Sequence, residues 1–248
     1  MMSVDVKEIV TERCCYIFGA GEYGECDLPD PLQGFVIAAD AGLAVLQKKG
    51  IVPDLLVGDF DSLKDVSQKA PEEYAGDQKE AETEKEGISG RIAGMLPQEK
   101  ILCHPPEKDD TDMMLAVKEG LRRGYREFRI YGGLGGRLDH TFANVQTLEY
   151  IAKQGGRGYL IGERETLTVI RNDCLIIPEG AQPDCRYVSV FCLGDAAEGV
   201  SLRNLKYPLE NAVLTKEFPL GVSNEFTGEK AQIEVMQGSL LVIMENRT

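Results

Sequence analysis

Acidic residues stand directly after several short apolar runs of the 248-residue sequence, at the points where those runs end. They form four groups: Asp40; Asp59 and Asp61; Asp109, Asp110 and Asp112; and Asp139. In an open parallel sheet the carboxyl ends of the strands share one edge, and ligands bind in the crevice outside that edge. If the apolar runs are parallel strands, the sequence brings carboxylates from four separate loops towards one place.

These carboxylates predict a site for a hard divalent cation, because clustered negative charges repel one another unless something neutralises them. Mg²⁺ prefers carboxylate oxygens together with substrate phosphates. In the string GDFDS, the two-residue step from Asp59 to Asp61 would turn both side chains to the same side of an extended segment. Any one acid alone has an ordinary alternative role in a turn or as a helix cap, as for Asp40, Asp109 and Asp110.

The string GGLGGRLDH at residues 132–140 supplies groups of the opposite polarity. Its four glycines, Gly135 and Gly136 among them, let backbone N–H groups approach a phosphate, and the helix that follows offers its positive N-terminus. Arg137 can hold phosphate oxygens with its forked guanidinium group. The alternative is a plain turn closed by an ion pair between Arg137 and Asp139.

His140 and Asn144 stand four residues apart, so they lie on the same face of the expected helix. We interpret His140 as a residue that contacts the nucleotide or caps the helix, in preference to a catalytic base. Asn144 shares the environment of His140.

The elements that must position these groups alternate through the first half of the chain. Short apolar, β-branched runs are each followed by Gly, Asp or Pro. Between them lie three expected helices, Ala41–Lys49, Asp110–Arg123 and Arg137–Gln154. This alternation indicates parallel strands with helices on both faces of the sheet.

The second half predicts an all-β structure. From about Arg157 the helical periodicity ends, and strand-like runs follow one another from Gly158–Ile161 to Leu240–Met244, with turn residues between them. We therefore expect an α/β N-terminal domain with a parallel sheet and flanking helices over residues 1–155. An all-β sandwich C-terminal domain is expected over residues 156–248.

The charge balance restricts the partners. With 27 Lys and Arg against 41 Asp and Glu, the formal net charge is −14, which argues against a nucleic-acid duplex or an anionic membrane as partner. The seven cysteines contain no CxxC pair and predict buried thiols in a reducing cytoplasm in preference to a zinc site. Neither a signal peptide nor a transmembrane helix is expected.

The sequence assigns no defined role to two further stretches. The acidic stretch Pro71–Gly87 predicts a solvated excursion from the domain. The string GAGEYG, Gly19–Gly24, follows the first expected strand and can contribute backbone to the same edge of the sheet.

The charges alone predict a Mg²⁺-dependent enzyme that acts on a phosphorylated nucleotide. Two alternatives remain at this point. One is a metal-dependent nucleotide-sugar transferase of the DxD type, which would share the acidic cleft. The other is a sensing module that binds a nucleotide or another small ligand without turnover.

Four strings in the first half resemble thiamine pyrophosphokinases of the bacterial type: AADAG (38–42), PDLLVGDFDS (53–62), HPPEKDDTDMMLA (104–116) and GGLGGRLDHTFANV (132–145). SLRNLKYPLEN (201–211) and GVSNEF (221–226) resemble the segments of that family on the thiamine side. The resemblance implies transfer of pyrophosphate from ATP to the thiamine hydroxyl with release of AMP. It also implies a homodimer whose active clefts lie between the subunits.

The resemblance also assigns residues to roles. Asp59, Asp61 and Asp112 correspond to Mg²⁺ ligands, with Asp40 and Asp109 in the same acidic cleft. The ATP side comprises Gly135, Gly136, Arg137, Asp139 and His140. Apart from the resemblance, helical spacing sets Asn144 beside His140, and Lys108 adds positive charge that offsets the acids of the cleft. On the thiamine side stand Ser223, Asn224 and Tyr207, whose ring can lie against the cationic thiamine. The alternative for Tyr207 is a strand residue packed in the sandwich.

Overall fold

A computed structural model describes residues 13–23, 28–29, 31–58, 97–103, 109–179 and 185–246 of the chain. The expected metal ligands Asp59 and Asp61 lie outside these described residues, and so do Lys108 and the acidic stretch 71–87.

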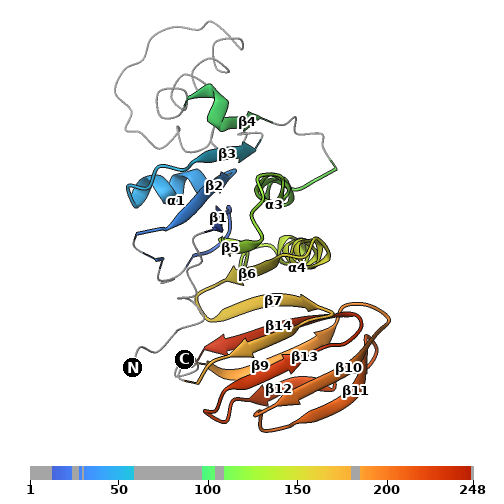
Figure 1. The fold of residues 1–248 in the computed structure, drawn as a ribbon. Helices are drawn as coiled ribbons and strands as arrows, with labels where there is room; N and C mark the ends of the chain where they lie inside the picture. The colour runs from blue at the N-terminus through green and yellow to red at the C-terminus, as the bar shows by residue number, and fades with distance from the viewer. Residues whose placement is uncertain are drawn as a thin grey trace, which may run out of the picture.

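The first half builds the parallel part of a sheet, in the order β6-β5-β1-β2-β3-β4 (Figure 1). Its elements are β1 (Cys14–Phe18), β2 (Gly34–Ala39), α1 (Gly42–Lys48), β3 (Leu55–Gly58), β4 (Ile101–Cys103), α3 (Asp112–Arg122), β5 (Glu127–Tyr131), α4 (Leu138–Lys153) and β6 (Arg157–Ile161), with a short 3₁₀ helix at Gln98–Lys100. In Figure 1, α1 lies on one side of this sheet and α3 and α4 lie on the other. The predicted α/β class of the N-terminal part is confirmed.

Alternating side chains of β1 supply the core on both faces of the parallel sheet. Cys15 and Ile17 belong to the cluster that contains the buried residues of α3 and α4. Cys14, Tyr16 and Phe18 belong to the cluster that contains the buried leucines of α1. Because helices cover both faces, the whole strand is buried, and its sequence is an unbroken apolar run.

The second half continues the same sheet and adds a second one. β7 (Glu165–Arg171) pairs antiparallel with β6, and the large sheet extends through β14 (Ser239–Asn246) and β9 (Cys185–Cys192) to β12 (Gly221–Glu225), which makes ten strands. Four strands form the other sheet: β11 (Leu209–Thr215), β10 (Ala196–Arg203), β13 (Ala231–Glu234) and β8 (Cys174–Ile177). Side chains from the two sheets share one core, including Val190 and Val242 with Val200 and Ile233. The expected antiparallel β structure is confirmed.

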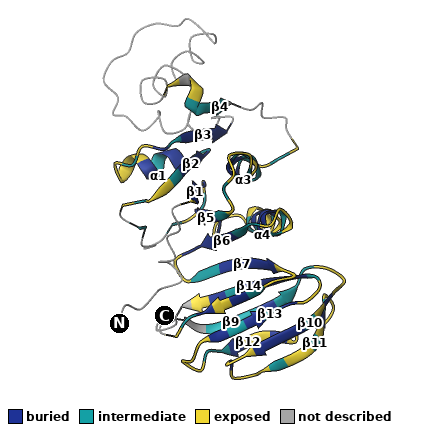
Figure 2. Ribbon diagram, viewed as in Figure 1, coloured by how far each residue is buried: buried dark blue, intermediate teal, exposed yellow. Residues whose placement is uncertain are grey.

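The run Gly158–Ile161 differs from its expected place in the antiparallel part. β6 pairs in parallel with β5 on one side and antiparallel with β7 on the other. One continuous sheet therefore passes through the expected boundary between residues 155 and 156, and that boundary stays a prediction. Figure 2 shows buried strand segments in both parts of the chain.

The helix ends follow local rules. Thr111 caps α3 because its hydroxyl oxygen accepts the N–H of Met114 at 3.1 Å, so the helix begins two residues later than expected. α1 and α4 are each one residue shorter at both ends than the expected ranges. Among the described residues, no helix is long and apolar enough to cross a membrane.

The buried cysteines of β1 behave as small apolar residues. Cys14 and Cys15 are 1% and 0% exposed. Burial raises the pKa of the Cys14 thiol to about 11 and raises that of Cys15 further. Both thiols are therefore protonated near neutral pH and lack the thiolate that reactive cysteines need.

Candidate active site

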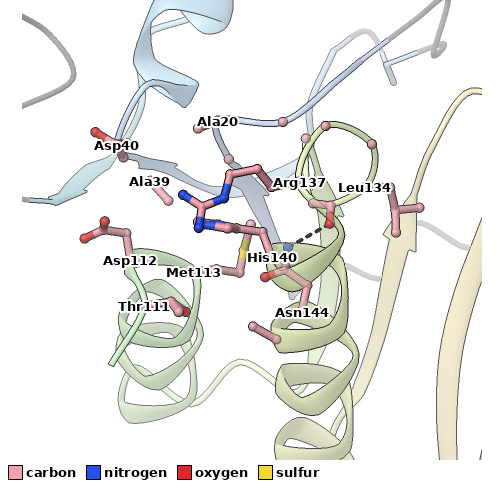
Figure 3. A pocket seen from close by; sticks show the side chains of 17 residues that line it. Ala20, Ala39, Asp40, Thr111, Asp112, Met113, Leu134, Arg137, His140 and Asn144 are labelled. Carbon is pink, nitrogen blue, oxygen red and sulfur yellow. Dashed lines mark hydrogen bonds between the residues drawn. The ribbon is translucent and has the colours of Figure 1, made fainter. Parts of the chain in front are cut away.

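A cleft of about 450 Å³ opens at the carboxyl edge of the parallel strands (Figure 3). The segments that follow β1, β2 and β5 line it, together with the first turns of α3 and α4. The lining residues are Gly19, Ala20, Gly21, Ala39, Asp40, Thr111, Asp112, Met113, Gly132, Gly133, Leu134, Gly135, Gly136, Arg137, His140, Ala143 and Asn144. Loops far apart in the sequence therefore converge at the edge where parallel sheets bind ligands.

Two of the expected acids lie in this cleft, on the side opposite Arg137 and His140 in Figure 3. Asp40 follows β2 with a φ of 50°, a left-handed conformation that is strained for a residue other than glycine, and its N–H donates to Val57 O at 2.9 Å. Asp112 occupies the first turn of α3, where the helix dipole favours a carboxylate.

The other described acids of these groups do not line the cleft. Asp109 is exposed just before α3. Asp110 pairs with Lys118 across the first turns of α3, at 2.6 Å between Oδ2 and Nζ. Of the three acids in the string DDTD, only Asp112 therefore lines the cleft.

The glycine-rich turn between β5 and α4 forms the opposite wall. Gly135 and Gly136 have φ values of 77° and 61°, a left-handed pair that residues with side chains rarely adopt. The side chain of Asn144, 7% exposed, donates from Nδ2 to Gly133 O at 2.7 Å and so ties the turn to α4 (dashed line in Figure 3). Asn144 therefore stabilises the position of the turn through this bond.

Arg137 carries the guanidinium group of the cleft and is paired with Asp139. Its Nη2 lies 2.6 Å from Asp139 Oδ2, and its Nε donates to Oδ1 at 3.1 Å. The hydrogen bond from Arg137 holds the pKa of the Asp139 carboxyl below its usual value, and the N–H of His140 also donates to that carboxyl. The ion-pair alternative is therefore present in this structure, and both side chains are largely exposed, so a phosphate can compete with Asp139 for the fork.

Comparison with known proteins matches both parts of the chain. A family model described as "Thiamin pyrophosphokinase, catalytic domain" matches residues 33–160, which carry most of the cleft. A second, "Thiamin pyrophosphokinase, vitamin B1 binding domain", matches residues 174–240. The chain belongs to the thiamin pyrophosphokinase family. Membership indicates a thiamine diphosphokinase, an enzyme that makes thiamine diphosphate by pyrophosphate transfer, and the family uses ATP as co-substrate.

Individual relatives agree with this assignment. Thiamine pyrophosphokinase of Bacillus subtilis (strain 168) is 26% identical over 212 residues, 84% of this chain and 85% of that protein. The crystal structure of the B. subtilis enzyme superposes with a TM-score of 0.73 at 25% identity, covering 94% of this chain and 98% of the other. That of Geobacillus thermodenitrificans thiamin pyrophosphokinase gives 0.72 at 26% identity, covering 94% and 97%. The resemblance found in the sequence is confirmed.

The expected thiamine-side residues of this thiamin pyrophosphokinase family member lie together around β12. Tyr207 is 57% exposed, and Lys206 Nζ lies 5.4 Å from its ring centroid. Ser223 is also exposed, at a bulge of β12 where its φ is 57° and its N–H donates to Ser189 Oγ. The two side chains therefore face solvent from neighbouring segments. The packed-strand alternative for Tyr207 does not hold.

Asn224 has a different environment, because it is 2% exposed and its amide bonds to the main chain. Its Oδ1 accepts the N–H groups of Tyr207 and Glu225, both at 2.9 Å, and its Nδ2 donates to Tyr207 O at 2.7 Å. These bonds use three of the four that an asparagine side chain makes at most. In this structure the amide thus holds the backbone of Tyr207.

The structure adds cleft residues that the sequence left without a role. Gly19, Ala20 and Gly21 line the cleft from the string GAGEYG, and Thr111 and Met113 line it from the start of α3. The signal for the first three was their position after the first parallel strand, at the carboxyl edge. Met113 has no such signal in the sequence, because its spacing along the helix is equally typical of a residue in the hydrophobic core.

Proposed function

We propose that this chain transfers the pyrophosphoryl group of ATP to the hydroxyl of thiamine, with Mg²⁺, and releases AMP. The observation that carries the proposal is the meeting, in one cleft of a thiamin pyrophosphokinase family member, of two carboxylates with a glycine-rich turn and a guanidinium group. Transfer of this kind depends mostly on alignment of the attacking and leaving oxygens and on neutralisation of phosphate charge. The carboxylates suit a metal ion that neutralises phosphate charge, and the glycine-rich turn and the guanidinium group suit the alignment of the phosphates.

The donor set fits a magnesium ion. The described residues contain no cluster of three or more His, Cys, Asp or Glu side chains that would form a complete protein cage. Mg²⁺ does not need one, because it is held by one or two carboxylates together with substrate phosphates and water. We assign Asp112, with Asp59 and Asp61, as its ligands and place Asp40 beside them. When bound, the ion neutralises charge on the transferring phosphates.

The turn and the start of α4 supply the nucleotide side. The left-handed turn at Gly135 and Gly136, with the N–H of Gly135, and the positive end of α4 suit phosphate oxygens. Arg137 exchanges its bond to Asp139 for a bond to phosphate, and His140 lines the same wall. Asp139 holds Arg137 before the nucleotide arrives. We also propose that Asp109 and Lys108, which precede α3 in the sequence, lie near this site.

An assay of AMP release tests the reaction. Purified protein with ATP, thiamine and Mg²⁺ should form AMP and thiamine diphosphate in equal amounts. Omission of thiamine or chelation of the metal should stop both products. Release of ADP, or AMP formation that does not depend on thiamine, would contradict the proposal, and so would release of nucleoside diphosphate from a nucleotide sugar.

We further propose a cytoplasmic homodimer with clefts shared between subunits. β12, which carries Ser223 and Asn224, is separated from β5 by the four strands β9, β14, β7 and β6. Five strand intervals of about 4.8 Å place the two sides roughly 24 Å apart across one sheet. A thiamine held at β12 is therefore too far from the phosphates of its own subunit, and a second copy supplies it.

Asn224→Ala should raise the KM for thiamine about tenfold and leave the KM for ATP unchanged, because the backbone of Tyr207 loses both of its bonds to the amide. Initial-rate kinetics with each substrate varied measures the two constants. Thr227→Ala is the matched control, since it removes one side-chain bond to the backbone of Asn204 in the same part of the chain. Equal changes in both KM values would count against a thiamine-specific role.

Co-expression of Asp112→Asn and Asn224→Ala subunits should recover activity at low thiamine concentration. In a mixed dimer with shared clefts, one cleft receives both defects and the other receives none. If each cleft were built within one subunit, every cleft would carry a defect and mixing would recover nothing. Light scattering that shows a fully active monomer would also refute the shared cleft.

A further inference from the structure

The segment Gly19–Tyr23 lies outside the residues that the family's catalytic model matches, yet it is docked along the glycine-rich turn. The N–H of Gly19 donates to Tyr131 O at 2.8 Å, and that of Gly21 donates to Gly132 O at 2.8 Å. The N–H of Glu22 donates to Leu134 O at 3.1 Å. The two backbones therefore run beside each other from the end of β5 into the turn.

The contact between the two backbones is too close for side chains in between. A Cβ atom on Gly21 would lie 2.6 Å from Gly132 O, and one on Gly132 would lie 2.6 Å from the ring of Tyr23. The Tyr23 hydroxyl donates to Gly19 O at 2.7 Å, and its ring stacks on Phe18. These contacts hold the segment in place and carry the side chain of Glu22 to the turn.

Glu22 bonds to the turn at its left-handed pair. The N–H of Gly136 donates to Glu22 Oε1 at 3.1 Å, and a Cβ atom on Gly135 would lie 2.7 Å from Glu22 Oε2. Glu22 does not line the cleft. It lines a second hollow of about 500 Å³, and among the described residues the two linings share only Leu134 and Gly135.

We propose that Glu22 is a positioning residue for nucleotide binding, which holds the Gly135–Gly136 turn in its phosphate-binding shape from outside the cleft. Two successive glycines have more conformational freedom than any other pair, and fixing them costs entropy when the ligand binds. A carboxylate on the N–H of Gly136 fixes the pair beforehand and, with it, the direction of Arg137, the next residue in the chain. The inference rests on the proposed function, because it takes nucleotide phosphates to bind at this turn.

Glu22→Ala should raise the KM for ATP about three- to tenfold, the range expected for one lost hydrogen bond, and leave the KM for thiamine unchanged. Glu22→Gln keeps an acceptor oxygen and should return the KM for ATP to within about twofold of wild type. Glu165→Ala is the matched control, because it removes a carboxylate from the same hollow and should change neither constant.

Hydrogen exchange of the peptide that contains residues 132–137, measured by mass spectrometry without substrates, gives a second readout. Exchange should be faster in Glu22→Ala than in wild type or Glu22→Gln. Unchanged exchange in Glu22→Ala would overturn the inference whatever the activity of the wild type, whereas a wild type that releases no AMP would overturn only the proposed function. A lower KM for ATP in Glu22→Gln would also overturn the inference about Glu22, since the Glu22 carboxylate would then compete with the phosphates.

Discussion

Asp112→Asn is expected to lower kcat for thiamine diphosphate formation about a hundredfold or more at saturating substrates. The substitution keeps the size of the side chain and removes the charge that we assign to the metal, and a bound metal ion contributes several kcal/mol to stabilisation of developing charge. The fold should survive, because the side chain is only half-buried at the first turn of α3. AMP release over a range of Mg²⁺ concentrations measures the effect, and the apparent affinity for Mg²⁺ should fall with it.

Asp110→Asn is the matched control for that variant. Asp110 stands two residues earlier, bonds to Lys118 and does not line the cleft. Its exposed ion pair contributes about 1 kcal/mol or less to stability, so kcat should stay near wild type. Wild-type turnover of Asp112→Asn across the same Mg²⁺ range would remove Asp112 from the metal site.

Arg137→Lys is expected to raise the KM for ATP about tenfold to a hundredfold and to leave the KM for thiamine nearly unchanged. An ammonium group cannot reproduce the two parallel N–H bonds that a guanidinium group makes to a phosphate. Charge-assisted bonds of this kind contribute about 1.5–3 kcal/mol each, which sets the expected range. Initial-rate kinetics with ATP varied at fixed thiamine measures the change.

Arg122→Lys is the control, because Arg122 is an exposed arginine of α3 that is paired with Glu119. Its substitution should change neither KM. A second variant, Asp139→Asn, removes the carboxylate that now occupies the fork of Arg137, so it should not weaken ATP binding as Arg137→Lys does. Equal kinetics for Arg137→Lys and wild type would contradict the assignment of the Arg137 fork to the ATP phosphates.

The cleft could be predicted from the sequence because its signals are local. Asp40 and Asp112 each stand where an apolar run or a helix begins or ends, and those limits follow from periodicity within a few residues. The parallel arrangement then brings such ends to one edge, whatever the detailed packing. Arg137 could be predicted as a phosphate-binding residue in the same way, since a glycine-rich turn before a helix binds phosphate in many folds.

Side-chain direction could not be predicted in this way. Ser223 and Asn224 are adjacent and were expected to serve the same ligand, but a bulge in β12 leaves Ser223 exposed and turns the amide of Asn224 onto the backbone of Tyr207. One extra residue in a strand reverses the face on which the following side chains lie, and the bulge has no distinct pattern in the string GVSNEF.

Periodicity, charge and the spacing of acids and glycines in the sequence by themselves determined the α/β and β parts and most of the cleft, and the resemblance of six strings indicated the family. Those properties depend on neighbours within one helix or strand. Only the tertiary structure decided that β6 joins both parts into one sheet and that Asp109 lies outside the cleft. It also decided that Glu22 bonds to Gly136 across 114 positions of the chain. Such a contact requires β1 and β5 to pair first, and no local pattern records that pairing because each strand alone satisfies the same apolar rule.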